Sequence, residues 1–325
     1  MNDVNDIMVS ICCSTYNHEK YISDAIESFL MQKTNFKFEI LIHDDASTDS
    51  TPEIIKKYEL KYPEIIKPLY QTENQYSKGI KVGQINRARA KGKYIAVCEG
   101  DDYWIDPYKL QKQVDYMEAH PGCSLCVHAA YRVSPSKKKL GKPIRPSKKS
   151  RIFKVEEIIS GGGGLFATNS NMYRTILVRD MPEFYIKAPV GDYPMAIYLA
   201  LLGEVYYMDE YMSAYRTNVP NSWTNRTMRD IKKKAEHVKK IVKMLEEIDE
   251  FSNFKYTEAI QRQILQYEIN LMIEQGNFDC IVSEKYRDFY KNMKLRTKLK
   301  IFLKQHFPNT YETLSNTKRK ILNDR

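Results

Sequence analysis

The sequence predicts an α/β protein in which a mainly parallel sheet is flanked by helices. Over the first 130 residues, short apolar runs alternate with amphipathic helical runs. A chain of 325 residues with 42% hydrophobic and 28% charged residues has the composition of a folded globular protein. Together these features indicate one large α/β domain with a smaller part after it.

Strands and helices are predicted in strict alternation. Apolar runs indicate strands at residues 8–14, 38–43, 66–71, 94–98 and 124–130. Helical periodicity marks the segments between them, at residues 21–31, 52–62, 81–91 and 107–120. Thr51 before Pro52 and Asp106 before Pro107 each place a capping side chain ahead of a proline suited to the first helical turn. The alternation implies a doubly wound sheet that binds ligands at the carboxyl ends of its strands.

The α/β domain is expected to span residues 1–225, with a helical, lysine-rich extension over residues 226–325. The net charge of +10 is unevenly distributed. Residues 137–154 carry nine Lys or Arg and no acidic residue, and residues 291–325 have a net charge of +8, which leaves the rest of the chain at −7. Such basic runs indicate partners with phosphate or anionic lipid. Residues 131–155 are expected to form a mobile loop.

The sequence favours a cytoplasmic protein. No apolar run approaches the roughly 20 residues that span a bilayer, and the acidic Asp3 and Asp6 precede the first apolar run, unlike a signal peptide. One possible membrane contact is residues 293–307, where apolar side chains share a helical face with lysines around it. That segment either lies on an anionic surface at the inner face of the cell membrane or packs on the domain with its lysines in solvent. We favour the first interpretation.

Three polar clusters follow directly after predicted strands, at residues 14–17, 44–49 and 99–104. In a parallel sheet all three converge on one edge. Each cluster alone has the composition of an ordinary turn, but the carboxylates of the second and third clusters, sharing one crevice, would repel unless something cationic or hydrogen-bonding is bound there. A divalent ion, Mn²⁺ or Mg²⁺, suits Asp101 and Asp102, because these ions take one or two carboxylates plus substrate phosphate oxygens.

Three sequence blocks carry a family resemblance: VSICCSTYNHEKYISDAIESFL, FEILIHDDASTDST and GKYIAVCEGDDYWIDPYKLQKQ. With these blocks the chain resembles glycosyltransferase family 2, which has the GT-A nucleotide-sugar-binding fold, and the resemblance extends over about residues 8 to 225. A GxGxxG fingerprint is absent, which counts against an ordinary dinucleotide-binding enzyme. The resemblance implies a metal-dependent inverting enzyme that moves a sugar from a nucleotide-diphosphate donor, usually UDP-linked, to a hydroxyl of a glycan or lipid-linked acceptor. Bacterial cell-envelope polysaccharides are typical products of such enzymes.

The resemblance also implies roles for individual residues in the donor site. Ser14 and Tyr16 match the start of the nucleotide pocket, Asp45 the carboxylate that accepts a hydrogen bond from the base, and Asp101 the ribose contact. Asp102 matches the metal ligand of the DxD-type motif. Glu99 occupies the first acidic position of that motif, where the family usually has Asp. Lys78, Lys81 or Arg87 could reach the diphosphate.

On the acceptor side, the block from Pro189 to Met195 places Asp192 at the position of the family's catalytic base. Asp is also a preferred N-cap, so the same residue could merely start the helix that follows it. The glycines and polar residues at 161–171 match a region that contacts acceptors in such enzymes, or they form a flexible loop.

One position departs from the family pattern. Many relatives have a His two residues after the position of Arg216, near the diphosphate, and here that residue is Asn218. An amide cannot carry the charge of a protonated imidazole. Either Asn218 keeps a weaker contact, or Arg216 or Trp223 takes it over.

The main alternative is a catalytically silent module that binds membrane or polysaccharide on the same scaffold. It would retain vesicle or glycan binding but turn over no nucleotide sugar. Nucleic-acid binding is disfavoured, because the crevice is acidic and the stacking platform typical of single-strand binders is missing. The sequence does not identify the donor sugar, the acceptor or the oligomeric state.

Overall fold

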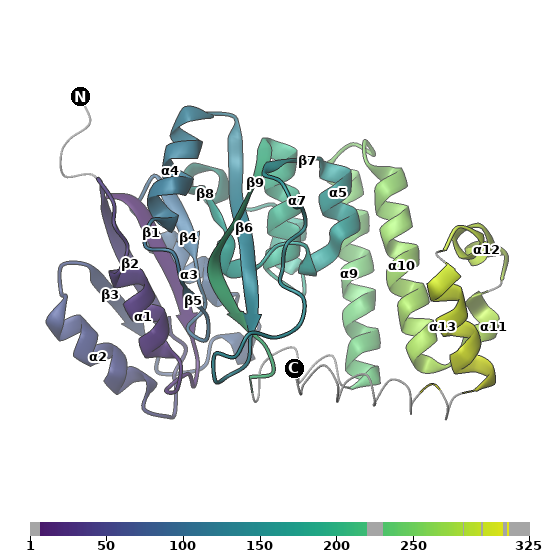
Figure 1. Ribbon diagram of the computed structural model, residues 1–325, viewed down its shortest axis with the longest axis horizontal. Helices are drawn as coiled ribbons and strands as arrows, with labels where there is room; N and C mark the ends of the chain where they lie inside the picture. The colour runs from purple at the N-terminus through teal and green to yellow at the C-terminus, as the bar shows by residue number, and fades with distance from the viewer. Residues whose placement is uncertain (1–6, 220–229, 282, 294, 308–310, 312–325) are drawn as a thin grey trace. The chain divides into compact units, whose positions relative to one another are not determined.

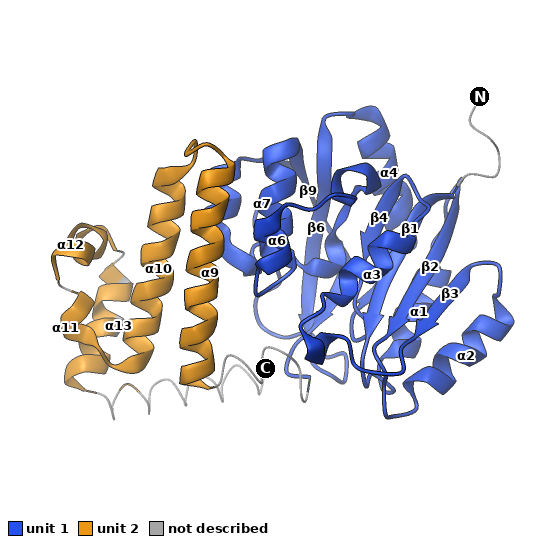
Figure 2. Ribbon diagram, turned by 180° about the vertical axis from the view of Figure 1, so that it is seen from behind, with its two compact units in different colours: residues 1–219 blue, residues 220–325 orange. Residues whose placement is uncertain are grey.

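A computed structural model describes residues 7–219, 230–281, 283–293, 295–307 and 311. The chain divides into two compact units, residues 1–219 and residues 220–325 (Figure 2). The first unit holds the sheet, and the described part of the second is helical. The predicted fold class, an α/β sheet followed by a helical extension, is confirmed.

The sheet of the first unit is mixed, with a parallel half. Its order is β3-β2-β1-β4-β8-β6-β9-β5, and β7 pairs with β9. The strands are β1 (Ile7–Thr15), β2 (Lys37–Asp44), β3 (Ile66–Tyr70), β4 (Tyr94–Val97), β5 (Tyr103–Trp104), β6 (Cys123–Val133), β7 (Arg151–Phe153), β8 (Met172–Arg174) and β9 (Glu204–Arg216). Strands β3, β2, β1 and β4 are parallel neighbours, as predicted. The short strand β8 was not predicted, and it lies antiparallel between β4 and β6.

Helices cover both faces of the sheet. Helices α1 (Ile22–Leu30) and α2 (Thr51–Lys61) lie toward the viewer in Figure 1, and α3 (Val82–Arg89) and α6 (Glu183–Lys187) lie on the opposite face (Figure 2). The remaining helices of this unit are α4 (Lys109–Ala119), α5 (Val155–Gly161) and α7 (Asp192–Leu202). The four predicted helices correspond to α1 to α4 with ends shifted by a few residues at most.

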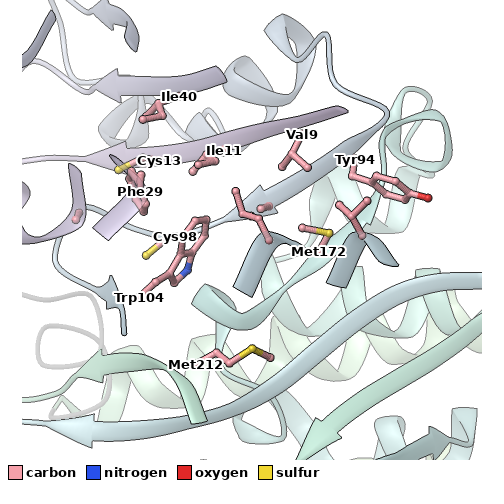
Figure 3. Close-up of a cluster of buried hydrophobic side chains, with 14 of the residues drawn as sticks. Val9, Ile11, Cys13, Phe29, Ile40, Tyr94, Cys98, Trp104, Met172 and Met212 are labelled. Atoms are coloured by element: carbon pink, nitrogen blue, oxygen red, sulfur yellow. The ribbon is translucent and has the colours of Figure 1, made fainter. Parts of the chain in front are cut away.

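The core beneath α1 and α4 is made by strand residues with large aromatic side chains between them (Figure 3). Val9, Ile11 and Ile40 are fully buried. Phe29 and Trp104 meet edge to face with ring centroids 4.9 Å apart, a favoured geometry for aromatic pairs. Trp104 is the last residue of the third polar cluster, so its burial anchors that cluster to the core.

The basic segment at residues 131–155, expected as a mobile loop, is built into the sheet. Strand β6 runs on to Val133, single bridges pair Ala130 with Ile144 and Val133 with Lys139, and β7 pairs with β9. Arg145 also forms a two-pronged ion pair with Asp209, at 2.6 and 2.5 Å. The acidic body of the unit neutralises part of this basic segment, which is why a highly charged stretch can be ordered.

The second unit contains α9 (Ile231–Phe251), α10 (Thr257–Gln275), α11 (Phe278–Ile281), α12 (Glu284–Lys291) and α13 (Leu295–His306). Its small core joins Ile269, Ile273, Ile281, Tyr286 and Ile301, with Met293 packed against it. The apolar residues expected to face a membrane are largely outside this core. Leu295 is 81% exposed, Leu299 54%, Phe302 49% and Phe307 52%, while Leu303 is partly buried. In the part of the chain that the structure describes, every helix is too short or too polar to cross a bilayer.

Candidate active site

The three polar clusters meet at the carboxyl end of β1. The backbone N–H of Asp45 donates to the Thr15 carbonyl at 3.0 Å, and that of Gly100 donates to the Ser14 carbonyl at 2.9 Å. The loops after β2 and β4 therefore lie on either side of the end of β1 (Figure 1). Gly100 packs so closely that a Cβ at this position would lie 2.6 Å from Thr15 Oγ1. Only glycine allows this approach, so the convergence predicted from strand order depends on a specific residue.

Asp45 ties in the loop that follows β3. Its carboxylate accepts hydrogen bonds from the backbone N–H of Gln75 at 2.8 Å and of Tyr76 at 3.1 Å. The side chain is 3% exposed. Beside it, Tyr16 at the end of β1 is 39% exposed and its ring is open to solvent. Asp45 thus has a structural task here, and its contact with a nucleotide base stays a prediction, as do the roles of Ser14 and Tyr16.

In the third cluster, the carboxylates of Glu99 and Asp101 can still accept a hydrogen bond or bind a cation. Glu99 Oε2 is buried and has no hydrogen-bond partner. Burial, and then the charges of Asp101 and Asp192, raise the pKa of Glu99 to about 8. A buried carboxyl group that lacks a donor is costly unless it is protonated or meets a cation.

Asp102, the metal ligand that the resemblance implies, has a different environment, and its metal role stays a prediction. Its Oδ1 accepts the backbone N–H of Arg216 at 2.7 Å and its Oδ2 accepts Asn169 Nδ2 at 3.1 Å. The residue is 1% exposed. Burial, with Asp101 and Glu99 nearby, raises the pKa of Asp102 well above its usual value. Asp102 therefore holds the cluster onto β9, and the side chains open to a cation are Asp101 and Glu99.

The donor set fits a hard divalent ion. Both open side chains supply carboxylate oxygens, and one of those oxygens is a buried acceptor without a donor. Among the residues described, no three carboxylate, imidazole or thiol groups come close enough to hold a metal alone. Magnesium and manganese sites with one or two protein carboxylates are completed by water and substrate phosphates.

Asp192 belongs to a segment far along the chain from the three polar clusters. It is the first residue of α7, and its Oδ1 accepts the N–H of Tyr193 at 2.7 Å. Burial raises the pKa of Asp192. Its charge contributes to the raised pKa of Glu99, and all four carboxylates contribute, after burial, to the raised pKa of Tyr215. Asp192 therefore lies within electrostatic range of the third acidic cluster.

The Arg216 side chain is buried and paired with neighbouring residues, so its charge is not exposed to solvent. Its guanidinium is fully buried between the rings of Tyr21 and Tyr103, at 4.9 and 4.8 Å. It donates to the Asp101 carbonyl at 2.5 Å and forms an ion pair with Asp24. A contact of Arg216 with the diphosphate stays a prediction. Asn218 has a left-handed backbone with φ of 62°, and Trp223 lies outside the described residues.

The family model for glycosyl transferase family 2 matches residues 10–177, more than half of the chain. The chain belongs to this family.

Curated relatives agree with the assignment. An uncharacterized protein of Mycobacterium tuberculosis (strain H37Rv) is 35% identical over 219 residues, which cover 66% of this chain and 60% of the relative. The putative teichuronic acid biosynthesis glycosyltransferase TuaG of Bacillus subtilis is 39% identical over 34% of this chain and 42% of its own. The Escherichia coli enzyme WfaP, a UDP-Glc:α-D-GlcNAc-diphosphoundecaprenol β-1,3-glucosyltransferase, is 42% identical over 34% of this chain and 41% of its own. The chain thus spans about 60% of the length of the relatives that it matches over the longest stretch.

Solved structures share the GT-A fold. Residues 1–349 of Staphylococcus aureus TarS, crystallised with UDP-GlcNAc, superpose with a TM-score of 0.60 at 17% identity, over 92% of this chain and 79% of that one. The mannosyltransferase PcManGT of Pyrobaculum calidifontis, bound to GDP-Man and Mn²⁺, gives 0.53 at 13% identity, over 94% and 89%. At these identities the similarity establishes the fold alone.

Within this family-2 site, Asn169 has a task that the sequence did not indicate. It was expected among acceptor-contacting or loop residues, yet it is fully buried. Its Nδ2 donates to Asp102 and to the Ala214 carbonyl at 3.0 Å, and its Oδ1 accepts from Ser213 Oγ at 2.8 Å. The Asn169 carbonyl accepts Trp104 Nε1 at 2.9 Å. Asn169 therefore holds both Asp102 and Trp104 in place by hydrogen bonds. No local sequence pattern indicates such a role for an asparagine.

Proposed function

We propose that this chain transfers a sugar from a UDP-linked donor to a hydroxyl of a glycan or lipid-linked acceptor, with inversion at the anomeric carbon. One observation carries the proposal. Asp192 at the start of α7 lies close enough to Glu99, which follows β4 at the carboxyl edge of the sheet, for its charge to raise the pKa of Glu99. A transferase of this kind needs both a base and a site for an anionic leaving group within a single pocket.

The donor class is supported by the relatives. The E. coli relative is named for transfer from UDP-Glc to a GlcNAc linked to diphosphoundecaprenol, and the S. aureus structure contains UDP-GlcNAc. The B. subtilis relative is named for teichuronic acid synthesis. A UDP-sugar donor and a cell-envelope polysaccharide or its lipid-linked precursor are the proposed substrates here.

The chain's own residues have separate tasks in this reaction. Ser14, Tyr16 and Asp45 would hold the nucleoside, and Asp101 with Glu99 would hold Mn²⁺ or Mg²⁺. When bound, the cation supplies charge that stabilises the departing diphosphate.

Asp192 accepts the proton of the acceptor hydroxyl as that oxygen bonds to the anomeric carbon. The bond from this carbon to the diphosphate oxygen breaks with its electron pair. Burial favours this task, because a base whose pKa is raised accepts a proton more readily.

A thermal-shift screen of UDP-, GDP- and TDP-sugars, each with and without Mn²⁺, tests the proposal. A ligand that binds only the folded protein raises its melting temperature by mass action. The expected result is a shift with UDP-sugars that grows when Mn²⁺ is present. No shift with any nucleotide sugar, together with retained vesicle or glycan binding, would instead indicate the catalytically silent module.

The exposed apolar face of α13 is a candidate contact with the membrane that carries a lipid-linked acceptor. Leu295, Leu299 and Phe302 recur at helical spacing and are half to four-fifths exposed. Lys298 lies on the same helix. A helix of this composition binds anionic lipid surfaces by apolar burial plus charge attraction.

A further inference from the structure

Two cations converge on one aromatic ring beside the proposed base. Lys81 Nζ lies 4.4 Å from the centre of the Tyr185 ring, and the Arg87 guanidinium lies 5.3 Å from it. Lys81 is the N-cap of α3, Arg87 is within the same helix, and Tyr185 belongs to α6 and is 2% exposed. The face of an aromatic ring attracts cations, but two cations at one ring also repel each other.

Neither cation has an acidic partner among the described residues, where no carboxylate lies within 4.0 Å of Lys81 or Arg87. Burial, and then the charge of Arg87, lower the pKa of Lys81 to about 8. Burial opposes the charge on Arg87, but the phenols of Tyr173 and Tyr185 outweigh that effect and raise the pKa of Arg87. A half-buried pair of like charges is unfavourable unless an anion joins it.

Both cations retain unused hydrogen-bond donors. Lys81 donates to the carbonyls of Tyr185 and Val190, the latter at 3.3 Å. An ammonium has three N–H groups, so one is left. Arg87 Nη2 is buried and has no hydrogen-bond partner. The pair therefore offers both charge and directed donors.

The pair lies on the side of the base. Val190, which Lys81 contacts, is two residues before Asp192. An added Cβ on Gly191 would lie 3.7 Å from the Tyr185 hydroxyl, and Asp192 contributes to the raised pKa of Tyr185. These contacts place Lys81 and Tyr185 beside the segment that carries Asp192. The group that meets the base in the reaction is the acceptor.

We propose that Lys81 and Arg87 form an anion site that binds a phosphate or carboxylate group of the acceptor. This inference rests on the proposed function, because it uses Asp192 as the base that meets the acceptor. It predicts a negatively charged acceptor, either a phosphate-bearing lipid-linked sugar or an acidic glycan. Uncharged acceptors would leave the two cations uncompensated.

The test is calorimetric titration of sulfate, a dianion at all relevant pH values, into full-length protein saturated with UDP and Mn²⁺. Saturation fills the place of the donor diphosphate, so sulfate reports on a second site. In Lys81→Met, which removes one charged donor, the affinity for sulfate should fall about 10- to 100-fold. Lys93→Met is the matched control, because Lys93 is half exposed, lies outside the site and is ion-paired with Glu118. In that variant the sulfate affinity should stay within about twofold of wild type.

A second measurement does not depend on whether Lys81→Met folds. Sulfate affinity of the wild type should fall between pH 7 and pH 9, as Lys81 loses its proton around a pKa of about 8. In Lys81→Arg the affinity should not fall in this range, because a guanidinium stays charged. Glu99 titrates in the same range, but it is present in both proteins, so their difference isolates Lys81. Arg87 and Tyr185, the other groups facing Lys81, keep their charge states below pH 9.

Each outcome of these titrations either supports or refutes the anion site. Equal sulfate affinity in wild type and Lys81→Met, or a pH profile that Lys81→Arg does not alter, overturns the anion site. Loss of UDP affinity in Lys81→Met to the same degree as loss of sulfate affinity would assign the cations to the donor diphosphate and refute the acceptor role. Failure of UDP to bind the wild type at all would instead refute the proposed function.

Discussion

Replacing Asn169 with Leu tests whether the buried hydrogen bonds around Asp102 hold the acidic cluster in place. The two side chains have the same branched skeleton of heavy atoms and Leu is the larger, so no cavity is left and the loss is mainly of hydrogen bonds. Three of them disappear, to Asp102, to the Ala214 carbonyl and from Ser213. Each buried group left without a partner costs about 1–3 kcal/mol, and because the three groups can relax together we expect a total of about 3–5 kcal/mol.

That loss should lower the melting temperature by about 10 °C, since about 1 kcal/mol corresponds to 2–4 °C in a domain of this size. Scanning calorimetry measures it. The chain has two units and need not unfold in one step, so the relevant transition is the one that UDP shifts. The UDP affinity measured with Mn²⁺ should fall as well, because Asp101 is adjacent to the displaced Asp102.

Asn171→Leu is the matched control. Asn171 is two residues away and 6% exposed, and its amide oxygen has no hydrogen-bond partner. We expect this variant to lose about 1 kcal/mol or less, since no satisfied side-chain acceptor is orphaned. Equal small losses in both variants would refute the view that Asn169 fastens the cluster.

Three further predictions address the site and the extension. Asp192→Asn should lower kcat by about 10²–10⁴-fold while UDP still binds, the usual contribution of a general base, and near-normal turnover would remove Asp192 from the mechanism. In metal-free protein, Glu99→Gln should become progressively more stable than wild type as pH rises from the ordinary carboxyl pKa toward about 8. The reason is that Glu99 keeps its proton in folded wild-type protein at pH values where the unfolded chain has released it. Urea titrations at several pH values measure the difference in free energy of unfolding, and a pH-independent difference would contradict the prediction. Phe302→Glu should weaken binding to phosphatidylglycerol vesicles about tenfold or more. The control Leu60→Glu changes an 83% exposed leucine of α2 and should not weaken this binding. Equal binding by both variants in vesicle sedimentation would rule out α13 as the contact.

The sequence by itself determined the parallel half of the sheet and the edge where the site lies. Strands β1, β2 and β4 are short apolar runs bounded by turn residues, and each is followed by its own polar cluster. Parallel connectivity then requires the clusters to meet, whatever the details of packing. The pairing of Asp192 with this edge came from the family resemblance, and its task as the base stays a prediction.

Only the tertiary structure decided what each carboxylate contacts. Strands β7 and β8 are three residues long, too short for a periodic pattern, and their place depends on the neighbours they pair with. Asp102 is satisfied by Asn169 and Arg216, which are 67 and 114 positions away, and Arg216 is paired with Asp24 at a separation of 192. Adjacent acidic residues look alike in a sequence. Burial and long-range partners make Asp102 a structural support and leave Asp101 and Glu99 open, because hydrogen bonding in a folded protein is set by packing rather than by position along the chain.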